Sequence, residues 1–197
     1  MFDRLRLKTK GYVVRDNFLP RYLVEEMRNF SLWDPRVTEA FSGGYFSKDF
    51  DQASDSLFTI KEIAEYIQTK SSLLRDLVYD RAWSFVYNQK CPGVESHADP
   101  STLQVNLWVT PNKAIADHKK NGLILYERKA PKEWSWRTYN KDTYKIGEYL
   151  KGSKYVRIPH KYNRAVIFPG NTFHKTDSVH TISGAENRRV NYTFLYQ

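Results

Sequence analysis

The sequence lacks several features that mark secreted, membrane-spanning or repeat proteins. It has one cysteine, Cys91, so no internal disulfide can form, and a reducing compartment, the cytoplasm, is expected. No apolar run approaches the roughly 20 residues that span a bilayer, so we expect no membrane contact. Residues 1–8 lack the apolar stretch of a signal peptide. Repeats, low-complexity stretches and Pro/Gly/Ser-rich linkers are absent too, which predicts a single domain over residues 1–197.

What the sequence does have is aromatic and basic residues. Hydrophobic residues make up 41% of the chain, with 11 Phe, 5 Trp and 14 Tyr, which excludes intrinsic disorder. The formal net charge of +9 favours an anionic substrate or nucleic acid as a partner. The basic residues are scattered, however, in runs no longer than pairs such as Lys119-Lys120. We therefore interpret the charge as a solvated surface.

The first 80 residues predict a helical layer. A short β-like run at 11–15 precedes apolar residues at helical spacing over 22–30. A second apolar stripe covers 61–79, with a break expected near Ser71-Ser72. These elements would support whatever follows.

Residues 81–197 have a different pattern, with short β-rich runs separated by loops that contain Gly, Pro, Asn or Asp. Many short strands with few helices between them predict an antiparallel double sheet, a jelly-roll or cupin-like barrel. The fold class is therefore expected to be mainly β with N-terminal helices (α+β), built on a double-stranded β-helix core. The expected strands are 82–87, 103–109, 123–126, 155–158, 164–168 and 190–196.

A long insertion at 127–154 interrupts this β-rich part. It contains Trp134, Trp136 and Tyr139, and a short helix is expected at 141–151. Segments of this length in a compact domain are usually functional. We expect a mobile flap over the barrel mouth that contributes to the choice of substrate.

The triplet His97-Ala98-Asp99 places an imidazole and a carboxylate two residues apart. On an extended chain both side chains point to the same face. With a histidine from another strand they would complete the two-His, one-carboxylate triad of non-haem Fe(II) oxygenases. By itself the triplet is a weak signal, because it occurs by chance in many proteins.

The C-terminal part supplies the missing context. Residues 163–177 predict a strand, a tight turn and then a histidine, and residues 186–196 predict a closing strand headed by arginines. With these stretches the chain resembles the Fe(II)/2-oxoglutarate-dependent oxygenases, in particular the prolyl-hydroxylase-like members. The matching stretches are 97–99, 105–111, 122–123, 163–177 and 188–196, which span more than half of the chain.

The resemblance implies that His97, Asp99 and His174 are the iron ligands. His180 is the alternative for the distal position, but the lead-in at 163–168 favours His174. We assign no role to His118 or His160, which lie in polar, loop-like contexts.

A cation is also needed for the distal carboxylate of 2-oxoglutarate, and Arg188 and Arg189 compete for that role. Strand alternation separates them. Arg189 shares a polar face with Asn191 and Thr193, whereas Arg188 shares an apolar face with Tyr192 and its alternate neighbours. We therefore expect Arg189 to point into the barrel and to be the anchor.

The same alternation directs Asn106 and Trp108 into the site, and the resemblance makes Tyr87 a candidate hydroxyl donor to 2-oxoglutarate. For Tyr87 and Trp108 the alternative is an ordinary place in the core. One departure from the family is Asn121-Gly122, where many relatives have two glycines. Asparagine tolerates unusual backbone angles, so the turn should survive with a changed shape at the site mouth.

The resemblance implies an Fe(II)- and 2-oxoglutarate-dependent dioxygenase. With O₂ it would hydroxylate a C–H of a protein or peptide side chain, or of a small amino-acid-like molecule, and release succinate and CO₂. Asp99 argues against the halogenating variants, which have a small residue there. One alternative is a nucleic-acid oxygenase on the same fold, which the charge favours but no recognition motif supports. The other is a non-catalytic cupin-like binding module, which the complete triad disfavours.

Overall fold

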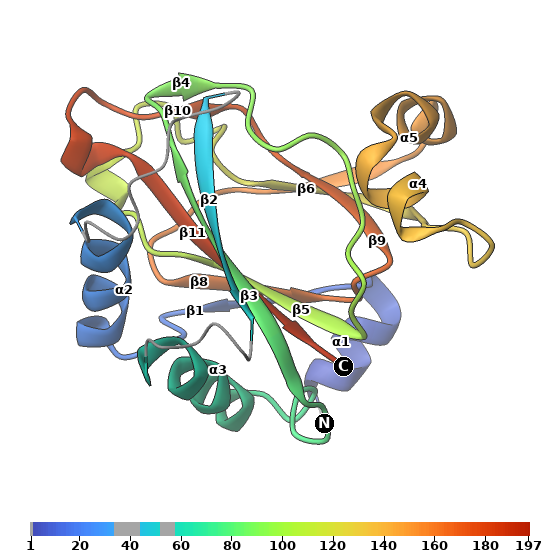
Figure 1. Ribbon diagram of the computed structural model, residues 1–197, viewed down its shortest axis with the longest axis horizontal. Helices are drawn as coiled ribbons and strands as arrows, with labels where there is room; N and C mark the ends of the chain where they lie inside the picture. Colours follow the sequence, from blue (N-terminus) through green and yellow to red (C-terminus); the bar gives the residue numbers. More distant parts are fainter. Residues whose placement is uncertain (1, 34–43, 52–57) are drawn as a thin grey trace.

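The computed structural model describes residues 2–33, 44–51 and 58–197. Two antiparallel sheets face each other and form a jelly roll, as the strand pattern predicts (Figure 1). The major sheet has six strands in the order β1-β8-β5-β11-β3-β2, and the minor sheet has three in the order β7-β6-β9. A two-stranded ribbon, β10-β4, lies at one end of the barrel.

The strands of the major sheet are, in spatial order, β1 (Val13–Asp16), β8 (Arg164–Phe168), β5 (Leu103–Trp108), β11 (Arg189–Tyr196), β3 (Tyr79–Tyr87) and β2 (Tyr45–Asp51). Those of the minor sheet are β7 (Tyr155–Ile158), β6 (Leu123–Lys129) and β9 (Thr172–Thr176). The ribbon consists of β10 (Val179–His180) and β4 (Lys90–Cys91). The expected strands over 82–87, 103–109, 123–126, 155–158, 164–168 and 190–196 are thereby confirmed, within a few residues at their ends.

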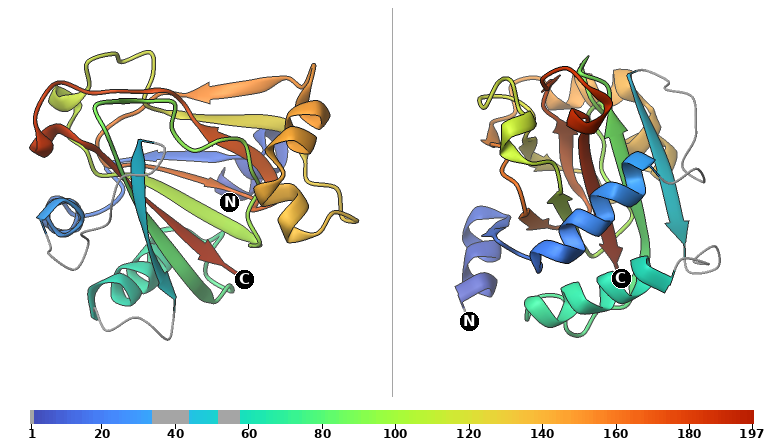
Figure 2. Two further views of the ribbon diagram at one scale, coloured as in Figure 1. Left: turned by 45° about the horizontal axis from the view of Figure 1, so that its top comes forward. Right: turned by 90° about the vertical axis from the view of Figure 1, so that its left-hand side faces the viewer.

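The helices lie on two sides of this barrel. Near the major sheet are α1 (Phe2–Lys10), α2 (Arg21–Trp33) and α3 (Phe58–Lys70), and Figure 2 shows α2 and α3 across the outer face of that sheet. At the opposite end from α2, beside β6 and β9, lie α4 (Trp136–Lys141) and α5 (Thr143–Leu150). Two 3₁₀ turns complete the structure, η2 (Asn112–Ala114) and η3 (Ala185–Asn187). Within the described ranges no helix is long and apolar enough to cross a membrane.

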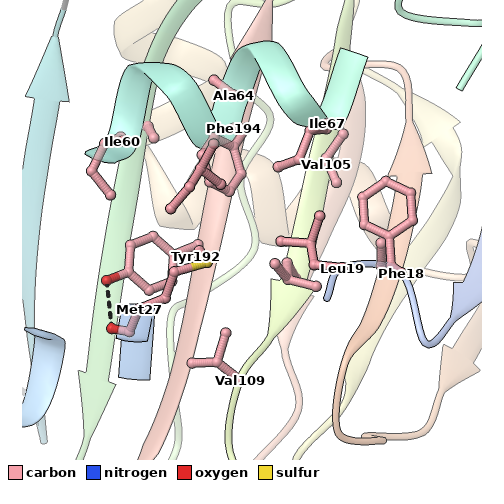
Figure 3. Close-up of a cluster of buried hydrophobic side chains, with 14 of the residues drawn as sticks. Phe18, Leu19, Met27, Ile60, Ala64, Ile67, Val105, Val109, Tyr192 and Phe194 are labelled. Carbon is pink, nitrogen blue, oxygen red and sulfur yellow. Dashed lines mark hydrogen bonds between the residues drawn. The ribbon is translucent and has the colours of Figure 1, made fainter. Parts of the chain in front are cut away.

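The main hydrophobic core fills the space between α2, α3 and the major sheet (Figure 3). Alternate residues of β5 and β11 point into it, so the apolar faces expected for these strands are confirmed. Two of its buried tyrosines have paired hydroxyls: the Tyr192 hydroxyl donates to the Met27 carbonyl oxygen at 2.9 Å, and the Tyr196 hydroxyl to that of Ala64 at 2.9 Å. The helical layer is thus bonded to the sheet as well as packed on it.

The second apolar stripe of the sequence is only partly helical. Helix α3 ends at Lys70, and residues 71–78 form turns, in which the Leu74 amide donates to the Ser71 carbonyl at 3.0 Å. The Gln68 side-chain amide closes this segment by donating to the Leu77 carbonyl at 2.5 Å. The expected break near Ser71-Ser72 is therefore present, and the apolar residues beyond it pack without forming a helix.

Candidate metal centre

Three side chains converge at the open end of the barrel. His97 lies in the loop before β5, Asp99 follows two residues later, and His174 is on β9. Their candidate ligand atoms all lie within 4.8 Å of one another. The Asp99 carboxylate lies near both rings, with Oδ1 3.8 Å from His97 Nε2 and Oδ2 3.4 Å from His174 Nε2.

Backbone hydrogen bonds hold this loop against β9. The amides of His97 and His174 donate to each other's carbonyl oxygens at 2.9 and 2.8 Å. The Asp99 amide donates to the Gly170 carbonyl oxygen at 2.9 Å. Gly170 permits this close approach, because a Cβ there would lie 2.3 Å from the Ser101 carbonyl oxygen. The ligand geometry is thus fixed by main-chain contacts before any metal binds.

The polar contacts around the three side chains fit a divalent cation. His97 Nδ1 lies 2.7 Å from the Glu95 carbonyl oxygen and His174 Nδ1 lies 3.0 Å from that of Thr172. Each Nδ1 must donate its proton to the carbonyl, which leaves the Nε2 lone pairs for a metal. Asp99 Oδ2 also has free lone pairs, because this buried atom has no hydrogen-bond partner among the described residues.

Burial sets the charge state of these groups. It lowers the pKa of His174 well below the usual value, an effect that the neighbouring His97 adds to, so His174 is a neutral imidazole. Burial also raises the pKa of Asp99, and the facing His97 opposes that change. The neutral His174 imidazole and the His97 ring beside a buried carboxylate with an unpaired oxygen are a ligand set that a metal ion completes.

The triad opens into a small pocket between the two sheets. Its walls combine apolar and hydrogen-bonding side chains from β3, β5, β11, β6 and β9. Besides the triad, the lining residues are Trp83, Phe85, Tyr87, Val94, Asn106, Leu123, Thr176, Asn191 and Thr193.

Strand register arranges the major-sheet side of this pocket in successive pairs. Asn106 is opposite Thr193 and donates to its hydroxyl oxygen at 3.1 Å. Asn191 lies two residues before Thr193 on β11, and Arg189 lies two residues before Asn191, opposite Tyr87 on β3. Because residues two apart on a strand share a face, the polar residues of β11 all point toward the barrel interior.

Arg189 is 1% exposed and forms part of this inner face. Its Nε donates to the Asn121 carbonyl oxygen at 2.9 Å, and its Nη1 to Asn191 Oδ1 at 2.6 Å. The guanidinium carbon lies 4.6 Å from the centre of the Tyr87 ring. Burial lowers the pKa of Arg189, and the adjacent Tyr87 opposes this. No carboxylate of the described residues lies within salt-bridge distance of this buried cation.

The other residues expected in the site are distributed as follows. Tyr87 and Asn106 line the pocket, and the Tyr87 hydroxyl is 3.1 Å from Thr176 Oγ1. Trp108 points to the same side of β5 but is fully buried beyond the pocket, among residues that join the two sheets. Arg188 precedes β11 and is half-buried. His180 is in the ribbon, outside the triad.

His160 differs from its sequence-based interpretation as a polar loop residue. It lies in a loop, but it is 7% exposed and its ring centre is 5.7 Å from that of Trp108. Neither of its ring nitrogens has a hydrogen-bond partner in the described ranges, and the same holds for Trp108 Nε1. Burial, together with the nearby positive charge of Arg189, holds the pKa of His160 well below the usual value. The end of the barrel beyond Arg189 is thus more polar than expected.

Asn121, the departure from the family pattern, connects the turn to the site. Its φ of 65° lies in the left-handed region that asparagine tolerates, as expected. Its side-chain amide donates to the Asp117 carbonyl oxygen at 2.9 Å and to that of His180 at 3.0 Å, and its own carbonyl accepts from Arg189. Asn121 therefore fixes the position of Arg189 as well as the turn.

The insertion at 127–154 lies directly beside the triad. It contains two short helices, α4 and α5, where one was expected. Trp134 and Tyr149 pack around Phe173, with ring centres 6.2 and 5.9 Å from it, and Ala98 belongs to the same cluster. The insertion thus contacts the ligand-bearing loop itself, and its mobility remains a prediction.

Some lining residues were missed at the sequence level. Trp83 and Phe85 carry a usable signal, because they alternate with Tyr87 on β3 and share its face. Val94 and Thr176 carry none, since their place in the pocket depends on how loops and β9 fold over the major sheet.

Comparisons with known proteins agree with this architecture. No protein-family model and no curated protein matches the chain. Among solved structures, the non-haem α-ketoglutarate-dependent epimerase SnoN from nogalamycin biosynthesis matches with a TM-score of 0.67 and 14% identity, over 100% of this chain and 82% of that one. HygX from Streptomyces hygroscopicus, solved with nickel and 2-oxoglutarate, matches with a TM-score of 0.65 and 8% identity, over 99% and 85%. A Pseudomonas putida prolyl-4-hydroxylase matches with a TM-score of 0.57 and 13% identity, over 100% and 97%.

Proposed function

We propose that this chain, which has the jelly-roll fold of the Fe(II)/2-oxoglutarate-dependent oxygenases, is itself a dioxygenase of that type. One observation carries the proposal: a His-Asp-His cluster lines a pocket whose wall includes Tyr87 and Asn191, and the buried Arg189, which has no carboxylate partner among the described residues, contacts both of these residues from behind that wall. The cluster fits a metal ion, and the arginine fits an anion. 2-Oxoglutarate has an oxo-acid end for the metal and a carboxylate for the arginine.

The chain's own residues prepare the site for both groups. His97 and His174 can each coordinate a metal through Nε2, because each Nδ1–H donates to a backbone carbonyl oxygen. Asp99 can coordinate it through Oδ2, which has no hydrogen-bond partner in the described ranges. Iron(II) bound there would supply, with 2-oxoglutarate and O₂, the oxidising power for hydroxylation of a C–H bond, with release of succinate and CO₂.

Arg189 would hold the distal carboxylate. Its planar guanidinium is already oriented by Asn121 and Asn191, so little side-chain entropy remains to be lost on binding. The Tyr87 hydroxyl, bonded to Thr176, is a neighbouring donor on the same wall. Burial raises the pKa of Tyr87, so this hydroxyl keeps its proton and can donate to an anion.

The apolar part of the pocket wall would exclude water from the reacting groups. Trp83, Phe85, Val94 and Leu123 are its apolar residues. In a site with little water, the interactions of charged groups with the cosubstrate strengthen. His97 is the most exposed ligand of the triad, at 17% of its side chain, which makes its side of the pocket the approach for a substrate.

The proposed substrate is a protein or peptide side chain or a small amino-acid-like molecule. By their names, the similar solved structures include a prolyl-4-hydroxylase and an epimerase from nogalamycin biosynthesis.

The proposal is tested by incubating the protein with Fe(II), 2-oxoglutarate and O₂ and measuring succinate. A panel of peptides, amino acids and oligonucleotides is added, and mass spectrometry detects a product heavier by one oxygen atom. We expect succinate release that a peptide or amino acid stimulates. Metal binding with no succinate under any condition would favour the non-catalytic module instead, and stimulation by oligonucleotides alone would favour the nucleic-acid oxygenase.

A further inference from the structure

We propose that Asn140, in the insertion, is a positioning residue for the metal centre: its side-chain amide orients the Asp99 carboxylate and thereby sets the metal affinity. This inference rests on the metal site of the proposed function. It assigns to the α4–α5 insertion a role in the chemistry of the triad, in addition to any role in the choice of substrate.

The contact that carries this inference is direct. Asn140 Nδ2 lies 3.3 Å from Asp99 Oδ1 and 2.8 Å from the Ala98 carbonyl oxygen. The preceding residue, Tyr139, accepts a hydrogen bond from the Ala98 amide at 2.9 Å. The end of α4 therefore holds the Ala98 residue on both its N–H and its C=O, as a neighbouring strand would.

This contact determines which carboxylate oxygen is left for a metal. Because the Asn140 amide donates to Oδ1, that oxygen has a partner, whereas Oδ2 has none and lies 3.4 Å from His174 Nε2. A carboxylate restrained at one oxygen loses its freedom to rotate about the Cβ–Cγ bond. Outer contacts of this kind orient metal ligands, and their removal commonly costs ten- to a hundredfold in metal affinity.

The rest of the insertion keeps Asn140 in place. The Ser135 hydroxyl caps α4 by accepting from the Thr138 amide at 3.3 Å, and the Asp142 carboxylate caps α5 by accepting from the Lys145 amide at 3.0 Å. Ile146 and Leu150 of α5 are buried in the cluster that also contains Ala98. The amide of Asn140 is thus presented by a packed element.

Three variants separate positioning from general stability. Asn140→Ala removes the amide, Asn140→Leu replaces it with an apolar group of similar size, and Tyr149→Phe is the matched control. The control deletes another hydrogen bond of the insertion, from the Tyr149 hydroxyl to the Lys129 carbonyl oxygen at 3.3 Å, without a contact to the triad. Calorimetric titration with Ni(II) alone measures the affinity, and the thermal midpoint of the metal-free protein measures the fold.

We expect both Asn140 variants to weaken Ni(II) binding by roughly ten- to a hundredfold, and Tyr149→Phe to change it less than twofold. The absorption spectrum of bound Co(II) should change in the Asn140 variants and not in the control. Nickel affinity within twofold of the original in a folded Asn140→Leu protein would overturn the inference and leave the proposed function intact. If the unaltered protein binds no Ni(II), the proposed metal centre itself fails.

Discussion

The two faces of the major sheet are built from the same strands but differ in how many buried polar atoms lack a partner. On the outer face, under α2 and α3, the buried hydroxyls of Tyr192 and Tyr196 donate to backbone carbonyls, whereas the Ser84 hydroxyl has no hydrogen-bond partner in the described part of the chain. On the inner face, several buried polar atoms have no hydrogen-bond partner in the described part of the chain. These are both amide atoms of Gln104, Asn106 Oδ1, Trp108 Nε1 and, on the facing loops, Asp99 Oδ2 and both ring nitrogens of His160.

This difference separates stability from function. An unpaired buried polar group costs about 1–3 kcal/mol, so a face with several of them is not optimised for the folded state alone. Such groups are retained where a ligand, a metal or ordered water supplies the partners. We therefore propose that the outer face mainly stabilises the fold and that the inner face, with more such groups, is the one prepared to bind.

The largest expected effect is the loss of the metal from the inner face. His174→Ala removes one of three ligands and should abolish stoichiometric Ni(II) or Fe(II) binding, while the thermal midpoint of the metal-free protein stays close to its original value. His180→Ala is the control, because His180 lies in the ribbon, outside the triad. If the His180 change abolished binding and the His174 change did not, the assignment of the distal ligand would be wrong.

Next in size is a cavity in the outer face. Phe194 is fully buried in the core between β11 and the helices (Figure 3). Phe194→Ala should lower the free energy of unfolding by about 3–5 kcal/mol. The Ni(II) affinity of the folded protein should remain within twofold. Denaturant unfolding and calorimetry measure the two quantities, and a large change in affinity would show that the faces are not independent.

A smaller effect is expected at the anion site. Arg189→Ala should raise the KM for 2-oxoglutarate by roughly ten- to a hundredfold, because a charge-assisted hydrogen bond contributes about 1.5–3 kcal/mol. Arg188→Ala should change it only a few-fold. Arg189→Lys should also be impaired, since a point charge does not reproduce the planar fork. Equal losses in the two alanine variants would contradict the assignment of Arg189 to the inner face.

The smallest expected effect is on stability, and it comes from Asp16 in the edge strand β1 rather than from either face of the sheet. Arg164 and Lys161 hold the pKa of Asp16 at about 2, against an ordinary 3.8. The folded state thus favours the ionised Asp16 carboxylate. The ion pairs of Asp16 with Arg164 and Lys161 therefore stabilise the fold fully above about pH 4, and this stabilisation is lost as the pH falls through about 2. Asp16→Asn should lower the free energy of unfolding by less than about 1 kcal/mol at pH 7. A difference between the two proteins that was as large at pH 2 as at pH 7 would contradict this.

Strand periodicity made the inner and outer faces predictable. In β11 the alternation of Arg189, Asn191 and Thr193 with apolar residues indicates both faces, and the structure places them accordingly. The spacing of His97 and Asp99 indicates the ligand pair in the same way. The sequence does not predict elements that lack such a pattern. Helix α1 leaves Phe2 and Leu5 exposed, at 77% and 60%, so it has little apolar face that a sequence pattern could reveal. The edge strand β2 mixes polar residues such as Lys48 and Asp49 into a short run.

Contacts between distant segments were beyond sequence reasoning. Asn140 is 41 residues from Asp99, and nothing in the sequence near it indicates a metal centre. His160 is in a polar stretch, and its burial follows from the packing of its loop over Trp108. Both depend on the three-dimensional path of loops, which local periodicity does not determine.

The most direct test of the account is a calorimetric titration of the protein with 2-oxoglutarate, with and without Ni(II), in the absence of O₂. If the inner face binds the metal ion and 2-oxoglutarate together, the metal-loaded protein should bind one 2-oxoglutarate per chain. The metal-free protein should bind it at least tenfold more weakly, because only Arg189 and its neighbours would remain as contacts. No binding to the metal-loaded protein, or equal affinity with and without the metal, would contradict the central claim that the triad and the buried arginine form one site.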